Sequence, residues 1–228
     1  DCLLSRGLGD VYKRQMLSYV QNVRNSRIFY VYTLSGYNIY ELFLRLNVLK
    51  KNKYPHIFKE CFLSISDYIF AYRYIFKIKY ITLNNVFYKN INIKRLIKYD
   101  LCFNRSISSS ITALLNFRFF YRLQLDNYTI KTAINWFENQ PLDKGWNYGM
   151  NKYFPDSNIY GYIGYLNLCK NYLAPYPTSV EQNAKVIPEL FFLPGAAYIN
   201  IFKTFNPNIK VELVTAFRFV SILYAKQY

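Results

Sequence analysis

Apolar and polar positions follow two periods along the chain, and these periods predict strands and helices in turn. Alternating β-branched and aromatic runs predict strands at residues 28–34, 132–137, 159–163, 190–193 and 210–215. Apolar residues at helical spacing predict helices over residues 39–49, 57–78, 111–125, 141–153 and 196–205. Because strands and helices alternate in the second half, the pattern predicts an α/β fold with a Rossmann-like, mostly parallel sheet and flanking helices.

The helix predicted over residues 57–78 carries one apolar side, which we expect to face the core. Its members are Phe58, Cys61, Phe62, Ile65, Ile69 and Tyr72. Residues 62–81 form the most apolar part of the chain, but charged residues interrupt them at four positions, from Asp67 to Lys79. A bilayer span is therefore not expected here. Residues 86–93 fit either a strand or an irregular segment.

The composition adds a large potential core and a strongly basic balance. Of the 228 residues, 52% are hydrophobic and 20% aromatic, and the formal net charge is +16. Such a chain fits one domain, or one domain with part of another, and it is not intrinsically disordered. The cations suit an anionic substrate or an anionic membrane surface, and they also fit an A/T-rich coding sequence whose lysines are solvated. Because they are scattered and form no basic tail, we expect no nucleic-acid partner.

The cysteines and the histidine give no sign of a metal site. Cys61, Cys102 and Cys169 are far apart in sequence, and His56 is the only histidine. This spacing predicts neither a zinc site nor a disulfide framework, and it favours a reducing, cytoplasmic location.

The two ends of the chain are interpreted separately from its middle. Residues 1–15 resemble the translated end of a transposon-based sequencing adapter, so we interpret them as an artefact. Residues 16–223 are then one Rossmann-like domain, and residues 224–228 are the start of a truncated remainder.

Chemically useful side chains are densest where the strand at residues 132–137 passes into the next helix. Glu138, Asn139 and Gln140 follow the strand directly, and Trp146 lies in the helix. In open α/β sheets, ligands bind at the carboxyl ends of the strands. A carboxylate there can act as a general base or bind a sugar hydroxyl, and an indole face can carry a sugar ring. Alternatively, the polar residues only cap the helix and Trp146 packs in the core.

Residues 136–149, together with four shorter motifs, resemble bacterial surface-carbohydrate biosynthesis proteins of capsule and lipopolysaccharide pathways. The shorter motifs are residues 162–164, 176–178, 185–188 and 216–219. These proteins are related to glycosyltransferases of the GT-B type, which have two Rossmann-like domains. The resemblance implies that this chain is the N-terminal, acceptor-side half of such a protein. It matches Glu138 to the family's catalytic glutamate, and it implies substrate contacts for Asn139, Gln140, Trp146, Tyr162 and Arg218.

The resemblance also implies the partners of the protein. The donor is a nucleotide sugar, a co-substrate that would bind through a domain missing from this chain, and no further cofactor or metal is expected. The acceptor is a glycan or a lipid-linked glycan, with possible peripheral contact to the inner membrane. The chain alone is then expected to be inactive. Two other classes stay open, which are a non-catalytic accessory protein of the same pathway and a basic nucleic-acid-binding protein.

Overall fold

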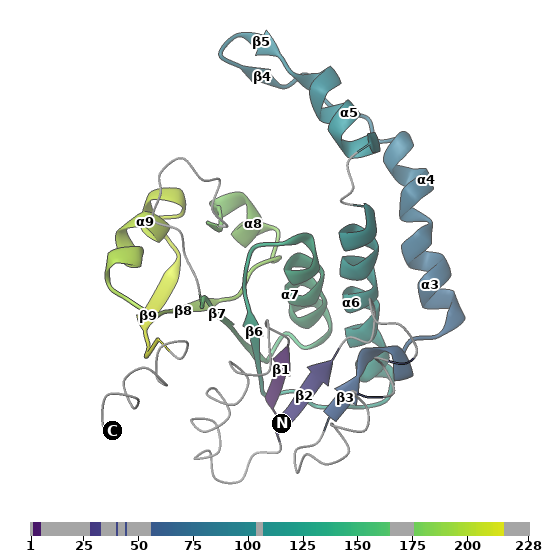
Figure 1. The fold of residues 1–228 in the computed structure, drawn as a ribbon, viewed down its shortest axis with the longest axis vertical. Helices are drawn as coiled ribbons and strands as arrows, with labels where there is room; N and C mark the ends of the chain where they lie inside the picture. The colour runs from purple at the N-terminus through teal and green to yellow at the C-terminus, as the bar shows by residue number, and fades with distance from the viewer. Residues whose placement is uncertain are drawn as a thin grey trace.

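A parallel sheet runs through the part of the protein that the computed structural model describes, which is residues 2–5, 28–32, 40, 44, 56–103, 107–164 and 176–216. Seven strands form this sheet in the order β3-β2-β1-β6-β7-β8-β9, and every neighbouring pair is parallel (Figure 1). The strands are β1 (Cys2–Ser5), β2 (Ile28–Tyr32), β3 (His56–Phe58), β6 (Thr132–Trp136), β7 (Asn158–Tyr162), β8 (Leu190–Leu193) and β9 (Lys210–Leu213). The predicted α/β fold with a Rossmann-like parallel sheet is confirmed.

The order of the strands reverses once, between β1 and β6. From β1 the chain adds β2 and then β3 on one side, and it returns to place β6 on the other side of β1, followed by β7, β8 and β9. In open α/β sheets such a reversal leaves a crevice at the carboxyl ends of the two strands, and ligands bind there. The residues that follow β6 therefore lie where this fold most often binds its ligand.

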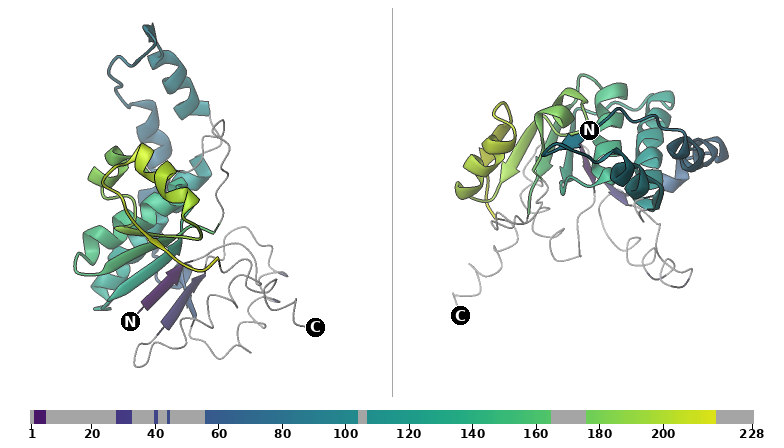
Figure 2. Two further views of the ribbon diagram at one scale, coloured as in Figure 1. Left: turned by 90° about the vertical axis from the view of Figure 1, so that its left-hand side faces the viewer. Right: turned by 90° about the horizontal axis from the view of Figure 1, so that it is seen from above.

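Two helices cover the middle of the sheet on one of its faces. They are α6 (Ile107–Leu125) and α7 (Pro141–Tyr153), which lie side by side in Figure 1 and are seen from above in the right-hand view of Figure 2. The core beneath them is formed by Val31, Ile57, Phe119, Phe120, Leu123, Ile130, Ala133, Trp146, Met150, Phe154 and Ile159. The two helices approach closely because α7 has Gly145 and Gly149 on its α6 side. A Cβ atom on Gly145 would lie 2.0 Å from the carbonyl oxygen of Ala113.

The far end of the sheet is covered by α9 (Ala197–Phe205), and the short helix α8 (Ser179–Asn183) precedes β8. A second core cluster lies here, made of Phe137, Ile163, Tyr176, Ile187, Phe191, Leu193, Phe202 and Ile209. The two clusters meet where β6 and β7 end. Ala133 and Ile159 in these strands belong to the first cluster, and Phe137 and Ile163, which directly follow the strands, belong to the second.

A long extension, which we call the arm, consists of residues 65–103. It contains α3 (Ile65–Tyr72), α4 (Tyr74–Lys79), the hairpin strands β4 (Phe87–Tyr88) and β5 (Ile91–Asn92), and α5 (Lys94–Phe103). The hairpin turn has positive φ at Lys89 (45°) and Asn90 (68°). In Figure 1 the arm rises past the top of α6 and carries the hairpin at its tip.

The helix predicted over residues 57–78 differs from the structure in two ways. Its first residues form β3 and a 3₁₀ turn, Lys59–Cys61, and the helix proper begins at Ile65. The expected core-facing stripe is wrong in its second half, because Ile65, Ile69 and Tyr72 are 80%, 57% and 53% exposed. The buried side of α3 is instead defined by Asp67, which pairs with Arg118 and Arg122 of α6.

Other predictions have mixed outcomes. The helices and strands predicted from residue 111 onward are confirmed within a few residues of their ends, and residues 86–93 form the β4–β5 hairpin. The helix predicted at residues 39–49 lies outside the described residues, apart from residues 40 and 44. The interpretation of residues 1–15 as an artefact stays a prediction, although the sheet uses Cys2–Ser5 as β1, between β2 and β6.

Candidate functional site

The candidate site is the loop between β6 and α7, at the point where the strand order reverses. β6 ends at Trp136 and α7 begins at Pro141, so residues 137–140 leave the carboxyl end of the strand directly beside β1. The backbone N–H of Phe137 still donates to the carbonyl of Tyr162, at 2.9 Å. Asn139 then has a φ of 55°, a left-handed conformation that asparagine tolerates better than most residues. This turn directs the chain from the sheet into α7.

The carboxylate of Glu138 is held by two side-chain donors. Its Oε1 accepts a hydrogen bond from Nε1 of Trp136 at 3.0 Å, and its Oε2 accepts one from Nε2 of Gln140 at 2.8 Å. The indole of Trp136 lies against Gly164, where a Cβ atom would be only 1.8 Å from the ring. Glu138 is partly exposed. The loop therefore presents an oriented carboxylate whose remaining lone pairs can accept further hydrogen bonds.

Asp143 supports this loop from below. It is 5% exposed, and its Oδ2 accepts from the backbone N–H groups of Glu138 and Gln140, both at 3.0 Å. Burial raises the pKa of Asp143 from 3.8 to about 6, although the two backbone hydrogen bonds act in the opposite direction. The nearby charge of Glu138 raises this pKa further. The position of Asp143, three residues after Gln140, is the spacing of a capping box, but the burial of its carboxylate beneath the loop is visible only in the structure.

Glu181 connects the start of α7 with the start of α8. It forms an ion pair with Lys144 at 2.5 Å, and it accepts from the backbone N–H of Thr178 at 2.8 Å. Asn139 Nδ2 donates a longer hydrogen bond to it, at 3.5 Å. Burial works to raise the pKa of Glu181, but the Lys144 ammonium and the Thr178 donors outweigh burial and lower it. Glu181 is therefore charged at neutral pH, and it holds Asn139 beside Glu138.

Two amide side chains of this region have buried atoms without a hydrogen-bond partner among the described residues. They are both amide atoms of Asn135, which is 1% exposed, and Oδ1 of Asn139. Leaving a buried polar atom unpaired costs about 1–3 kcal/mol. Asn135 lies in the carboxyl half of β6 between Ser5 and Gly161. Unpaired amides at the end of this strand are groups that a polar ligand or water can satisfy.

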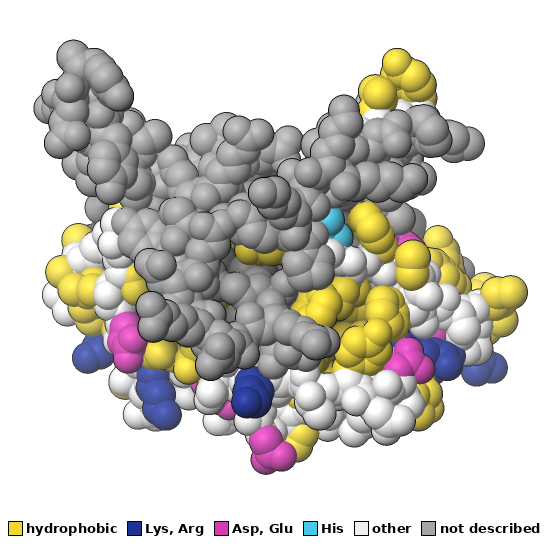
Figure 3. Space-filling model, turned by 90° about the horizontal axis from the view of Figure 1, so that it is seen from below, with side chains coloured by type: hydrophobic (Ala, Val, Ile, Leu, Met, Phe, Trp, Pro, Cys, Tyr) yellow, Lys and Arg dark blue, Asp and Glu magenta, His cyan; other side chains and the backbone are white. Residues whose placement is uncertain are grey.

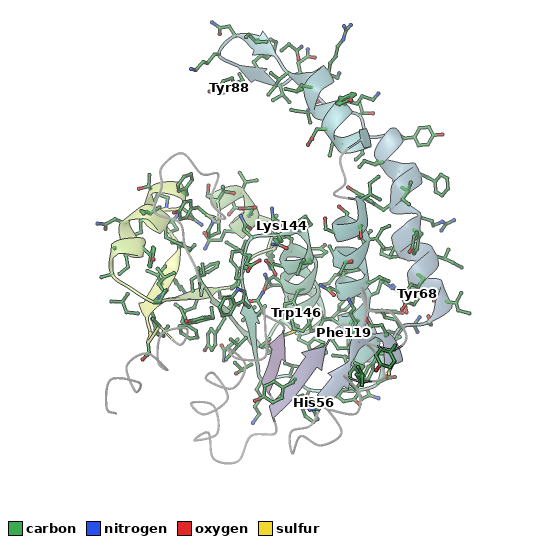
Figure 4. The ribbon with its side chains drawn as sticks, viewed as in Figure 1. His56, Tyr68, Tyr88, Phe119, Lys144 and Trp146 are labelled. Atoms are coloured by element: carbon green, nitrogen blue, oxygen red, sulfur yellow. The ribbon has the colours of Figure 1, made fainter. Side chains whose placement is uncertain are left out.

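Of the six residues expected at the site, the structure places Glu138, the expected catalytic residue, together with Asn139 and Gln140 in the loop after β6. Trp146 instead lies in the core at 4% exposure, with its ring 4.5 Å from that of Phe120. Its indole face is therefore covered and cannot support a sugar, which corrects the expected contact (Figure 4).

Tyr162 is also placed in the interior rather than at a binding surface. It is 1% exposed, and its ring lies 5.2 Å from that of Trp136. Its effect on the site is thus indirect, through the packing of the tryptophan that donates to Glu138. Arg218, the last of the expected contacts, lies outside the described residues.

A groove of about 650 Å³ opens beside this loop, between α6, α7 and the base of the arm. Pro141 and Lys144 belong to both the groove and the start of α7. Most of its remaining wall is aromatic or cationic, formed by Phe70, Tyr74, Phe117, Arg118, Tyr148, Lys152 and Tyr153. Lys152 Nζ lies 5.3 Å from the ring centroid of Phe117. The groove can therefore accept an apolar or ring-containing ligand with a negative charge.

Neither a metal-binding cluster nor a membrane-spanning helix occurs in the described ranges of the chain. They contain no group of three or more His, Cys, Asp or Glu side chains arranged to hold a metal ion. Within them, too, every helix is too short or too polar to cross a bilayer.

Comparison with protein-family models and with curated proteins gave no match to this chain.

Proposed function

We propose that the chain is a glycosyltransferase-like protein of bacterial surface polysaccharide biosynthesis, of the capsule or lipopolysaccharide type. It would move a sugar from a nucleotide-activated donor to a glycan or lipid-linked acceptor, in peripheral contact with the inner membrane. The observation that carries the proposal is the oriented Glu138 carboxylate at the carboxyl end of β6, where the strand order reverses. The unpaired amide atoms of Asn135 and Asn139 support a polar ligand at the same place.

Glu138 would act on the acceptor. In the transfer step a hydroxyl oxygen of the acceptor forms a bond to the anomeric carbon of the donor sugar while the bond to the leaving nucleotide breaks. The hydroxyl proton passes to the Glu138 carboxylate, which acts as the general base. The donors Trp136 and Gln140 fix the direction in which the carboxylate accepts that proton. Asp143 is a positioning residue, since it contacts only the backbone of this loop in the described interactions.

The groove beside α7 would bind the part of the acceptor next to the reacting hydroxyl. Its aromatic wall suits sugar rings or an apolar lipid segment, and the Lys152 ammonium suits a phosphate group on the acceptor. The donor would bind through the second domain that the family resemblance implies. Under this proposal the described residues provide acceptor binding and the base.

The experiment is the replacement of Glu138 by glutamine in a protein that includes the donor-binding domain. Glutamine keeps the size and one acceptor oxygen but cannot take up the proton, so transfer is expected to fall by about 10²–10⁴-fold. The matched control is Glu189→Gln, the same change at an exposed position before β8. Equal transfer by Glu138→Gln and the unmodified protein, with both folded, would refute the assignment.

A non-catalytic accessory role is the second candidate, and one observation favours it. Both carboxylate oxygens of Glu138 already accept hydrogen bonds from within the protein, as those of a purely structural residue would. In that case Glu138→Gln lowers the thermal unfolding midpoint, and a bound glycan is never elongated when donor is added. A catalytic role predicts the reverse, with lost turnover and little change in that midpoint.

A further inference from the structure

The outer side of the arm carries an apolar stripe that no described residue covers. Ile65, Ile69, Tyr72, Phe76 and Tyr80 are 80%, 57%, 53%, 67% and 84% exposed. They are spaced by three or four residues, so they lie on one side of the helical path through α3 and α4. The path is nearly continuous, because Arg73 between the two helices has helical φ and ψ of −57° and −22°. The side chains along this edge point away from the body of the protein (Figure 4).

The tip of the arm is also apolar and exposed. Phe87, Tyr88 and Ile91 of the β4–β5 hairpin are 62%, 61% and 66% exposed. Each hairpin strand has only two residues, and the hairpin is separate from the main sheet. An isolated two-stranded hairpin is only marginally stable in water, and contact with water is unfavourable for its exposed apolar side chains. The tip therefore gains more from contact with an apolar phase than a polar loop would.

The arm has a large excess of positive charge. Between residues 68 and 99 there are seven basic residues and no Asp or Glu. The seven are Arg73, Lys77, Lys79, Lys89, Lys94, Arg95 and Lys98. At the end of the molecule opposite the arm, by contrast, basic and acidic side chains occur near one another (Figure 3). The whole arm also contains Asp67, which is buried, and Asp100, so its net charge is +5 (7 − 2) and its surface is cationic as well as apolar.

We propose that the outer side of the arm binds the surface of a bilayer that contains anionic lipids. The apolar stripe would lie at the boundary between headgroups and acyl chains, with Phe87, Tyr88 and Ile91 of the hairpin inserted beside it. Exposed basic residues next to the stripe, such as Arg73 and Lys77, would contact lipid phosphates. Aromatic and basic side chains together are the combination that favours the membrane interface.

Two other occupants fit the arm less well. If a second copy of the chain bound through the same stripe, Arg73 and Lys77 of one copy would face the same cations of the other. Residues 68–99 contain no Asp or Glu to pair with them, and like charges across an interface repel each other. A nucleic acid would pair with the cations and stack on the aromatic rings. It would leave aliphatic side chains such as Ile65, Ile69 and Ile91 exposed, because phosphates and sugars offer them no apolar contact.

The position of the arm connects the inference with the candidate site. The arm rises on the side of the sheet where β6 ends and α7 begins (Figure 1). The groove is lined from the arm by Phe70 and Tyr74, which are not part of the stripe, so a membrane on the outer side of the arm would leave the groove uncovered. The inference deepens the peripheral membrane contact of the proposed function, and it rests on that part of the proposal alone.

The test measures binding of the chain of residues 1–228 to vesicles by co-sedimentation, without donor or acceptor. Vesicles of phosphatidylcholine alone are compared with an equal mixture of phosphatidylcholine and phosphatidylglycerol. The chain is expected to bind the anionic vesicles at least about 10-fold more tightly, because each basic residue near the surface contributes about 5-fold in affinity. Glu138→Gln should bind vesicles as the unmodified chain does, so loss of transfer and loss of membrane binding are separate results.

Two pairs of substitutions assign the binding to the arm. The apolar pair, Phe76→Ser with Tyr80→Ser, and the basic pair, Arg73→Gln with Lys77→Gln, change exposed side chains only. Each pair should weaken binding to anionic vesicles at least about 10-fold. The matched controls are Leu125→Ser with Val180→Ser, and Lys131→Gln with Lys203→Gln, which are exposed positions outside the arm. The controls should change binding less than about 2-fold.

Several results would overturn the inference. The inference is wrong if the folded chain does not bind anionic vesicles, or if the arm variants bind them as tightly as the control variants do. Tighter binding to a single-stranded oligonucleotide than to vesicles, lost in the basic pair, would assign the arm to nucleic acid instead. A concentration-dependent dimer that the apolar pair abolishes would assign it to a second copy. Circular dichroism and thermal unfolding of each variant verify that binding is compared between folded proteins.

Discussion

Replacing Asp67 by asparagine tests how the arm is attached to the rest of the protein. The Asp67 carboxylate is fully buried, and it accepts from Nε of Arg118 at 2.5 Å and from Nε of Arg122 at 2.7 Å. The backbone N–H of Ser64 donates to it at 2.9 Å. Burial alone would raise the pKa of this carboxyl. The donors Arg122, Ser64 and Arg118 outweigh burial and lower the pKa from 3.8 to about 2.

The size of the effect follows from that pKa. Lowering it from 3.8 to about 2 corresponds to about 2 kcal/mol of stability when the carboxylate is charged. Asparagine keeps the shape and one acceptor but loses the charge. Because the side chains of Arg118 and Arg122 are still 19% and 24% exposed, water can solvate them, so the cost should stay below that of a fully buried ion pair. We expect Asp67→Asn to lower the free energy of unfolding by about 2–3 kcal/mol at pH 7.

The pH dependence gives a second, independent check. A carboxyl group whose pKa is lowered by folding stabilises the protein fully above its unfolded pKa, and this contribution is lost as pH falls through the folded pKa. The difference between the unmodified protein and Asp67→Asn should therefore be constant above about pH 5 and shrink between about pH 5 and pH 1. Urea unfolding followed by tryptophan fluorescence measures it, with the exposed Asp156→Asn as control. A loss below about 0.5 kcal/mol at pH 7, or a difference independent of pH, would refute this reasoning.

Two further predictions concern α7. Because folding raises the pKa of Asp143 to about 6, its charged form opposes folding, so the unmodified protein should lose up to about 3 kcal/mol as pH rises from 4 through 6. Asp143→Asn should lack this loss, and thermal unfolding midpoints between pH 4 and pH 7 that run parallel for both proteins would contradict it. Gly145→Ala should cost about 3 kcal/mol or more, since its Cβ atom would lie 2.0 Å from the backbone of Ala113. Gly195→Ala, where the nearest atom is 3.7 Å away, should cost less than about 1 kcal/mol, and equal unfolding midpoints for the two variants would show that the helices separate easily.

The second half of the fold could be predicted from local pattern because its elements are regular and clearly bounded. Strand β6 alternates in burial along its length, and Pro141 stands at the first position of α7. The strand β3 was missed because its three residues merge with the apolar spacing of the helix that follows. Short apolar runs of this kind fit a strand and a helix equally well, and only pairing with β2 decides between them.

The candidate site was predictable in part. Glu138, Asn139 and Gln140 follow a predicted strand, so their place at its carboxyl end could be expected from the sequence. Asp143 gains its raised pKa from burial, which no local pattern shows. Trp146 has the chemistry of a sugar platform, but its direction on α7 places it against Phe120 in the core.

The sequence by itself determined the α/β class, most elements after residue 107, and the polar loop that follows β6, because these depend on contacts between residues near one another in the chain. Tertiary structure decided the strand order, which depends on pairings such as that of β1 with β6. It also decided which side of α3 is buried. The apolar side would be buried if helix periodicity alone mattered, but Asp67 binds Arg118 and Arg122, which are 51 and 55 residues away. A charge paired in the interior holds its helix face there, so the apolar stripe of the arm is left exposed.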